Sequence, residues 1–214
     1  MESAVEIHPK PSLSWGGARL RSNRVSDCLS RKQAVATIGA AQQAIAIGLP
    51  FNRFVTVHWA ALGLTDLDAA HATGRLLKLA GDWMRYNEAA PTWAFVREND
   101  DGDGSKGSHV HILMHCPSSL PIGRQWPRWL RKVTGRPYRK GGIRSLAIGR
   151  ALNCYANVPE LYLENLGEVV AYCVKGVTPE TASALSLPRQ EAGGRVIGKR
   201  AGHSQNLSRV KRGS

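Results

Sequence analysis

The sequence has few cysteines, few acidic residues and no long apolar segment, and each shortage excludes a class of protein. None of its four cysteines (Cys28, Cys116, Cys154 and Cys173) belongs to a CxxC pair, so neither a cysteine-based zinc site nor a redox motif is predicted. This usage fits a reducing, cytoplasmic setting. No apolar run approaches the roughly 18 residues of a membrane span, and residues 1–20 do not have the pattern of a secretory signal. No GxxxxGK[ST] motif is present, so no helicase domain is expected.

The shortage of acids leaves a strongly basic chain. Its 214 residues include 29 Lys and Arg against 16 Asp and Glu, a formal net charge of +13. Such a charge favours a polyanionic partner, with nucleic acid as the first choice. The 43% hydrophobic content and six tryptophans indicate a folded chain. The length suits one compact domain with tails.

Most of the excess charge lies in residues 124–150, which contain nine cations and no acid. The predicted nucleic-acid contacts are Arg124, Arg128, Arg131, Lys132, Arg136, Arg139, Lys140 and Arg144. Trp126, Trp129 and Tyr138 are interleaved with them. Cations neutralise phosphates and aromatic faces stack on unpaired bases. The same pattern also fits a solvated basic surface with the two tryptophans packed in the core.

The periodicity of apolar residues predicts an α+β fold with a central antiparallel sheet and flanking helices. Strands are expected over 51–60, 91–99 and 109–116, the last two forming a hairpin; helices are expected over 28–47, 65–86, 126–133 and 160–176, with Gly167 as a candidate break. Three parts are predicted: an arm with an Ala-rich helix (1–48), a functional domain (49–178) and a basic C-terminal tail (179–214).

A histidine pair is the sharpest chemical feature. His109 and His111 are two residues apart on a predicted strand, so their imidazoles point to the same face. Glu98 ends the preceding strand of the hairpin and can lie opposite the pair. Two imidazoles and a carboxylate form a mixed nitrogen and oxygen site that suits Mn²⁺ or Mg²⁺. Two histidines without a metal are the plain alternative. The loop acids Asp100, Asp101 and Asp103 are expected to form a solvated turn, with metal ligation as the alternative.

A second feature is the Tyr172-Cys173-Val174-Lys175 sequence near the end of the last long helix. Residues three apart share a helical face, so Lys175 can stand beside the Tyr172 hydroxyl. A nearby ammonium favours the phenolate, which is the nucleophilic form of tyrosine. A tyrosine packed by its ring, with Lys175 at the negative end of the helix, fits equally well.

Taken in order, Phe54 to Trp59 (FVTVHW), His109-Val110-His111 and Tyr172 to Lys175 (YCVK) resemble the three motifs of the HUH endonucleases. More narrowly, they resemble rolling-circle replication initiator (Rep) proteins of small plasmids and single-stranded DNA phages. The resemblance covers roughly residues 50–178. The tyrosine follows the histidine pair, as in Rep proteins and small tyrosine transposases, and no second tyrosine lies four residues before or after Tyr172.

The resemblance implies a ferredoxin- or RRM-like sheet that carries the metal site. It implies nicking of single-stranded or hairpin DNA at an origin through a 5′-phosphotyrosine, with host replication proteins as further partners. Tyr172 would be the nucleophile and Lys175 would assist the phosphate or the phenolate. Glu98, His109 and His111 would hold Mn²⁺ or Mg²⁺.

Two other functions stay open at this stage. One is a non-enzymatic single-strand binding module on an RRM-like sheet, which needs stacking aromatics on the sheet face. The other is a small HUH tyrosine transposase. A histidine-triad nucleotide hydrolase would need a third histidine at position 113, where the sequence has Leu113.

Overall fold

The computed structural model describes residues 24–100 and 106–208, so Asp101 and Asp103 lie outside the described residues. Its elements are, in order, β1 (Val25–Ser26), α1 (Arg31–Ala46), β2 (Arg53–His58), α2 (Asp66–Tyr86), β3 (Thr92–Asp100), β4 (Gly107–His115), η1 (Ile122–Arg124), α3 (Trp126–Thr134), β5 (Ile143–Ala147), α4 (Cys154–Asn157), α5 (Pro159–Val174), α6 (Pro179–Ala184), β6 (Val196–Ile197), β7 (Ala201–His203) and η2 (Gln205–Leu207).

The main sheet has five antiparallel strands in the order β5-β2-β4-β3-β7. The chain runs β2–α2–β3–β4–α3–β5, so β4 inserts between β2 and β3. This is the split β-α-β arrangement of the ferredoxin-like fold, extended by β7 at the free edge of β3. The predicted α+β class and the β3–β4 hairpin are confirmed.

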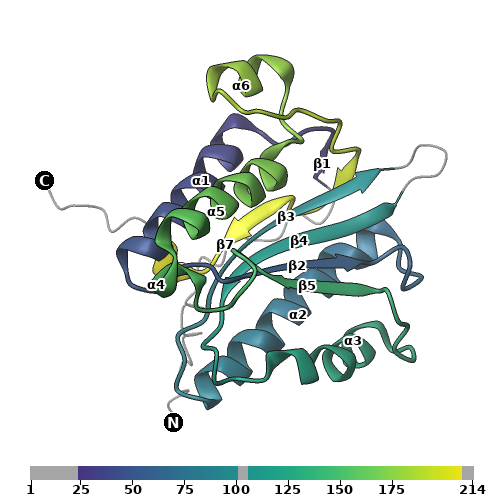
Figure 1. Ribbon diagram of the computed structural model, residues 1–214. Coiled ribbons are helices and arrows are strands. Elements are labelled where there is room, and N and C mark those ends of the chain that lie inside the picture. Colours follow the sequence, from purple (N-terminus) through teal and green to yellow (C-terminus); the bar gives the residue numbers. More distant parts are fainter. Residues whose placement is uncertain (1–23, 101–105, 209–214) are drawn as a thin grey trace, which may run out of the picture.

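Helices cover both faces of the sheet (Figure 1). The helices α2 and α3 lie on one face, and α1 and α5 lie on the other. Alternation along β2 explains the division, because successive side chains point to opposite faces. Val55 and Val57 belong to the core with α2 and α3, whereas Thr56 and His58 point to the face of α1 and α5.

The second face is only partly covered. The core beneath α1 and α5 includes Val96 and Leu113 from β3 and β4 and Ala201 from β7. Toward the β5 edge of this same face, Leu146 of β5 is exposed and Phe54 of β2 is half-buried. The face therefore has a closed half and an open half, and the predicted site residues lie where the two halves meet.

Helix boundaries follow ordinary capping chemistry. Ser30 caps α1 in a reciprocal capping box with Gln33, and the Thr65 side chain accepts a hydrogen bond from the Asp68 amide at the start of α2. The candidate break in α5 was wrong, because the helix runs without interruption through the exposed Gly167. No helix of residues 24–100 and 106–208 is both long and apolar enough to cross a membrane.

Candidate metal centre

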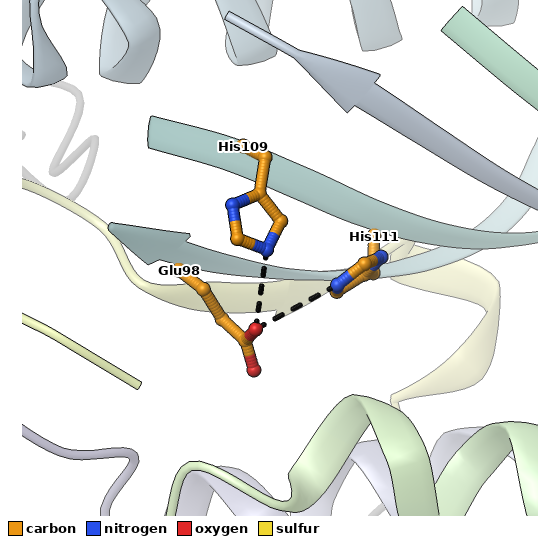
Figure 2. A group of neighbouring side chains, drawn as sticks. All are labelled: Glu98, His109 and His111. Carbon is orange, nitrogen blue, oxygen red and sulfur yellow. Dashed lines mark hydrogen bonds and ion pairs between the residues drawn. The ribbon is translucent and has the colours of Figure 1, made fainter. Parts of the chain in front are cut away.

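Strand register brings the carboxylate and the two imidazoles together. Glu98 lies directly opposite His109 in the β3–β4 pairing, and His109 and His111 share the same face of β4. The three side chains converge in Figure 2, where His109 and His111 both point to the Glu98 carboxylate. All three are buried, and their ligand atoms lie within 4.8 Å of one another.

The hydrogen bonds around the cluster leave acceptor atoms pointing inward. His109 Nδ1 lies 2.8 Å from the carbonyl oxygen of Gly107. A carbonyl only accepts, so Nδ1 carries the proton and a neutral ring keeps its lone pair on Nε2. That atom faces Glu98 Oε2 at 3.2 Å. A lone pair against a carboxylate oxygen is repulsive unless a proton or a metal cation lies between them.

His111 is also oriented by a contact at Nδ1. This atom lies 3.0 Å from the Thr56 hydroxyl, which orients the ring as an outer partner of a metal-binding imidazole does. His111 Nε2 and Glu98 Oε1 are among the buried polar atoms of the described residues that have no hydrogen-bond partner. Such atoms are costly to leave unsatisfied. The donor set and these two atoms fit a divalent cation, and Glu98, His109 and His111 form a candidate metal-binding group.

Electrostatics keep the cluster in the form that binds a metal. Burial opposes ionisation of Glu98, but the adjacent His109 and His111 side chains and the Lys175 ammonium outweigh it and lower the pKa of the carboxyl. Burial also lowers the pKa of His111 below its usual 6.5, despite the favourable contact with Glu98. A charged carboxylate beside a neutral imidazole is the protonation state that metal ligation requires.

Tyr172 lies beside this cluster. It belongs to the last turn of α5, whose neighbouring Cys173 and Val174 are buried in the core. Its half-buried ring meets the His111 imidazole edge-on, with 5.1 Å between ring centroids, and the Phe54 ring at 6.1 Å. The sheet and the last long helix thus bring the phenol next to the histidine pair.

Lys175 lies beside Tyr172 and also pairs with two carboxylates. Its buried ammonium forms ion pairs with Glu98 Oε2 at 2.9 Å and Glu191 Oε2 at 3.0 Å. It lies 5.0 Å from the centroid of the Tyr172 ring. Two carboxylates compensate this one charge, and Lys175 thereby holds Glu98 in place.

The sequence did not identify Arg189 and Glu191, which follow α6 in the chain and lie next to the site. The Arg189 guanidinium lies 5.6 Å from the Tyr172 ring centroid, and it pairs with Glu191. The Glu191 amide donates to the Lys175 carbonyl oxygen at 3.0 Å, which ties this segment to the end of α5. Residues this far from the motifs in the chain carried no signal beyond their charge.

A cavity of about 230 Å³ opens over the candidate metal centre. Its lining consists of Phe54, Thr56, His58, Lys106, His109, His111, Arg144, Leu146 and Tyr172. Arg144 is the member of the predicted nucleic-acid set that reaches this cavity, since it lies on β5 opposite Thr56. His58 also lines it, with its ring 5.7 Å from that of His109.

The other predicted nucleic-acid contacts lie elsewhere. All of Arg124, Arg128, Arg131, Lys132, Arg136, Arg139 and Lys140 are exposed, on η1, on α3 or in the loop before β5. Trp126 and Trp129 are buried in the core under α3. The alternative that places these two rings in the core is therefore confirmed, and they offer no face for a base. Tyr138 is exposed.

Comparisons of the chain with models of protein families, with curated sequences and with solved structures found no match. The fold and the site therefore stand on geometry: a five-stranded antiparallel sheet carries a buried His-x-His and glutamate group, which is consistent with the HUH motif, beside a tyrosine on the last long helix.

Proposed function

We propose that this protein is a divalent-metal-dependent endonuclease of single-stranded DNA that cleaves through a covalent phosphotyrosine. The observation that carries the proposal is the buried Glu98, His109 and His111 group, with unsatisfied acceptor atoms, next to the Tyr172 ring. Within this class, the order of the motifs matches both Rep proteins and small tyrosine transposases, and our first candidate is an HUH-type initiator that nicks and rejoins an origin of rolling-circle replication in a plasmid or phage. Host replication proteins would extend the freed end.

The reaction follows from the residues around the cavity. The Tyr172 oxygen attacks the scissile phosphorus, the bond between phosphorus and the 3′ oxygen breaks, and the 5′-phosphate becomes attached to the tyrosine. The phenol loses a proton and the departing 3′ oxygen gains one, so charge balances and a free 3′-hydroxyl results. Attack by a 3′-hydroxyl on the phosphotyrosine reverses these steps and rejoins the strand.

Glu98, His109 and His111 would hold Mn²⁺ or Mg²⁺. A divalent cation there supplies Lewis-acid polarisation of the scissile phosphate. The Arg189 guanidinium lies 5.6 Å from the Tyr172 ring centroid, and its positive charge suits a bound phosphate. Lys175 fixes Glu98 through an ion pair at 2.9 Å, so its proposed part is to position the carboxylate.

The open half of the sheet supports single-stranded DNA as the substrate. Phe54 and Leu146 lie opposite each other on β2 and β5 beside the tyrosine, and they offer an apolar surface to an unpaired base. Arg144 lies two residues before Leu146 in the same cavity and suits a backbone phosphate. The same open surface is the observation that favours the second candidate, a module that binds single strands without cleaving them.

An oligonucleotide assay separates the two. Wild-type protein is incubated with labelled single-stranded DNA and Mn²⁺, and denaturing electrophoresis then detects a covalent protein–DNA species. We expect the adduct with wild type and its loss in Tyr172→Phe, with DNA binding retained. Tyr155→Phe is the control, because Tyr155 is exposed at the start of α4 and away from the cavity lining. Binding without an adduct on any single-stranded substrate would favour the module.

A further inference from the structure

A second groove lies on the opposite face of the sheet, between α2 and β3. Its main cavity measures about 810 Å³, and a neighbouring cavity of about 520 Å³ shares Arg85 and Trp93 with it. We name the two together the α2–β3 groove. The lining residues that matter here are Arg75, Lys78, Arg85, Trp93, Phe95 and Lys199.

Aromatic rings form the β3 side of the groove. Trp93 and Phe95 are two residues apart on β3, and their ring centroids are 5.9 Å apart. Trp93 is held at both backbone groups by Ser204: its amide donates to Ser204 Oγ at 3.1 Å and its carbonyl accepts from the Ser204 amide at 2.9 Å. The half-buried Trp93 is therefore a fixed platform that both cavities reach.

The charge around the groove is positive. The lining of both cavities includes four cations and no carboxylate. Asp82, outside the lining, pairs with Lys78 at 2.6 Å and with Arg85 at 3.1 Å, so these two are partly compensated. Lys199 forms no ion pair with any residue in 24–100 or 106–208, and its ammonium lies 5.8 Å from the Phe95 ring.

Aromatic faces beside uncompensated cations match the two parts of a nucleotide. Bases stack on aromatic rings and phosphates bind Lys and Arg, a combination typical of single-strand binding surfaces. We propose that the α2–β3 groove binds single-stranded nucleic acid, with a base on Trp93 and a backbone phosphate at Lys199. This site is separate from the proposed nicking site, because Trp93 and Glu98 point to opposite faces of β3.

Binding measurements test the groove without any cleavage. Anisotropy of a fluorescein-labelled oligo-dT strand is recorded in EDTA, with Tyr172→Phe as the parent protein. Trp93→Leu keeps an apolar side chain but removes the stacking face, and we expect affinity to fall about tenfold. Lys199→Gln should reduce the slope of log Kd against log salt by about 0.7, the value for one phosphate contact on a single strand.

Matched controls lie outside the groove. Lys32→Gln removes an exposed cation on α1, and Tyr86→Leu removes an exposed aromatic ring at the end of α2; both should leave affinity and salt slope unchanged. Photocrosslinking with an iodouracil-substituted strand should place an adduct on Trp93. Unchanged binding in Trp93→Leu and Lys199→Gln, with crosslinks confined to other peptides, would overturn the proposal. If these variants lost binding to an acidic peptide but still bound oligo-dT, the proposal would be overturned in favour of a protein partner.

The two proposals fail in different ways. The groove assay uses neither metal nor the tyrosine, so a negative adduct assay leaves its outcome untouched. Conversely, Trp93→Leu in the wild-type background should still form the covalent adduct at saturating DNA. Normal adduct formation in the wild type, together with groove variants that bind DNA as well as their parent, would refute the groove proposal alone.

Discussion

Two adjacent residues of β3, Arg97 and Glu98, are both buried and charged, but they face opposite sides of the sheet and meet different surroundings. Arg97 donates to Asp66 Oδ1 at 2.5 Å and to the carbonyl oxygens of Asp66 and Ile197, each at 2.7 Å. The Asp66 carboxylate also accepts from the Ser108 hydroxyl at 2.8 Å. On this face both terminal nitrogens of Arg97 meet acceptors, although its Nε is buried without a hydrogen-bond partner, and a charge pair joins α2 to the sheet.

Glu98 instead faces the Nε2 atoms of His109 and His111, at 3.2 Å and 3.7 Å from its Oε2. Its ion pair with Lys175 balances its charge, but Glu98 Oε1 and His111 Nε2 are buried without a hydrogen-bond partner in the described chain. Buried polar atoms without such partners do not stabilise a fold by themselves. The comparison teaches that burial of charge has a structural reason on one face, whereas on the other it leaves room for a cation.

The largest expected effect lies on the structural face. Arg97→Met would remove the buried cation that pairs with the largely covered Asp66 carboxylate, and we expect the free energy of unfolding to drop by about 3–5 kcal/mol. Chemical denaturation measures it, with the exposed Arg75→Met on α2 as the control. A loss no greater than that of the control would mean that the two faces do not differ as described.

Metal binding should stabilise the folded protein only through the face of the sheet that carries Glu98 and the histidine pair. With Mn²⁺ at a hundred times its Kd, the wild-type free energy of unfolding should rise by about 2.7 kcal/mol, and His109→Gln should abolish this gain. In EDTA the same variant should lose only about 1 kcal/mol or less, because no satisfied ion pair is removed. Thermal melts with and without Mn²⁺ give both numbers; an equal gain in His109→Gln would contradict the assignment.

Acid should act on the site face as well. Burial is the main cause that lowers the pKa of His58, His111 and His115 from the usual 6.5. Below that pH the unfolded chain binds protons that the folded chain does not, so stability in EDTA should fall as pH falls. The lowered pKa of Glu98 predicts a further loss below its usual 4.5, because the unfolded carboxylate becomes protonated there while the folded one stays charged.

One variant isolates the contribution of His111 to this pH dependence of stability. His111→Gln should reduce the pH dependence of unfolding by up to about 1.4 kcal/mol per pH unit, while Arg75→Met should leave it unchanged. Urea denaturation in EDTA at a series of pH values measures the slope. A slope that His111→Gln does not alter would show that the other histidines account for it.

The smallest expected effect concerns the outer partner of His111. Thr56→Val removes the hydroxyl that contacts Nδ1 at 3.0 Å and keeps the shape of the side chain. We expect Mn²⁺ affinity to fall about tenfold, as is usual when such an orienting contact is lost. Calorimetric titration provides the measurement, and an unchanged affinity would mean that ring packing against Phe54 and Tyr172 suffices to orient the imidazole.

Much of the fold could be predicted because it is local. Runs rich in β-forming residues over 51–60 and 109–116 predicted the central strands, and helical spacing predicted α1 and α2, with Thr65 as the N-cap of α2. The opposition of Glu98 and His109 followed from the hairpin alone. By contrast, β5 and β7 are short and carry little alternation, and their strand geometry depends on pairing with β2 and β3.

The site could be predicted only where strand or helix geometry fixes a side chain. His109 and His111 needed nothing beyond the period of two. Helical spacing brought Lys175 next to the Tyr172 ring, but it could not show that the ammonium also pairs with the carboxylates of Glu98 and Glu191, because these lie on other segments. Arg189 escaped notice because a segment after α6 brings it to Tyr172 from outside every motif.

The most direct measurement is the chemical identity of the attached residue. Wild-type protein is reacted with single-stranded DNA and Mn²⁺, digested with nuclease and protease, and analysed by mass spectrometry. The account predicts a nucleotide phosphate on Tyr172, and no adduct either in EDTA or in His109→Gln. An adduct on a different residue, or an equal yield without the metal ligands, would contradict it.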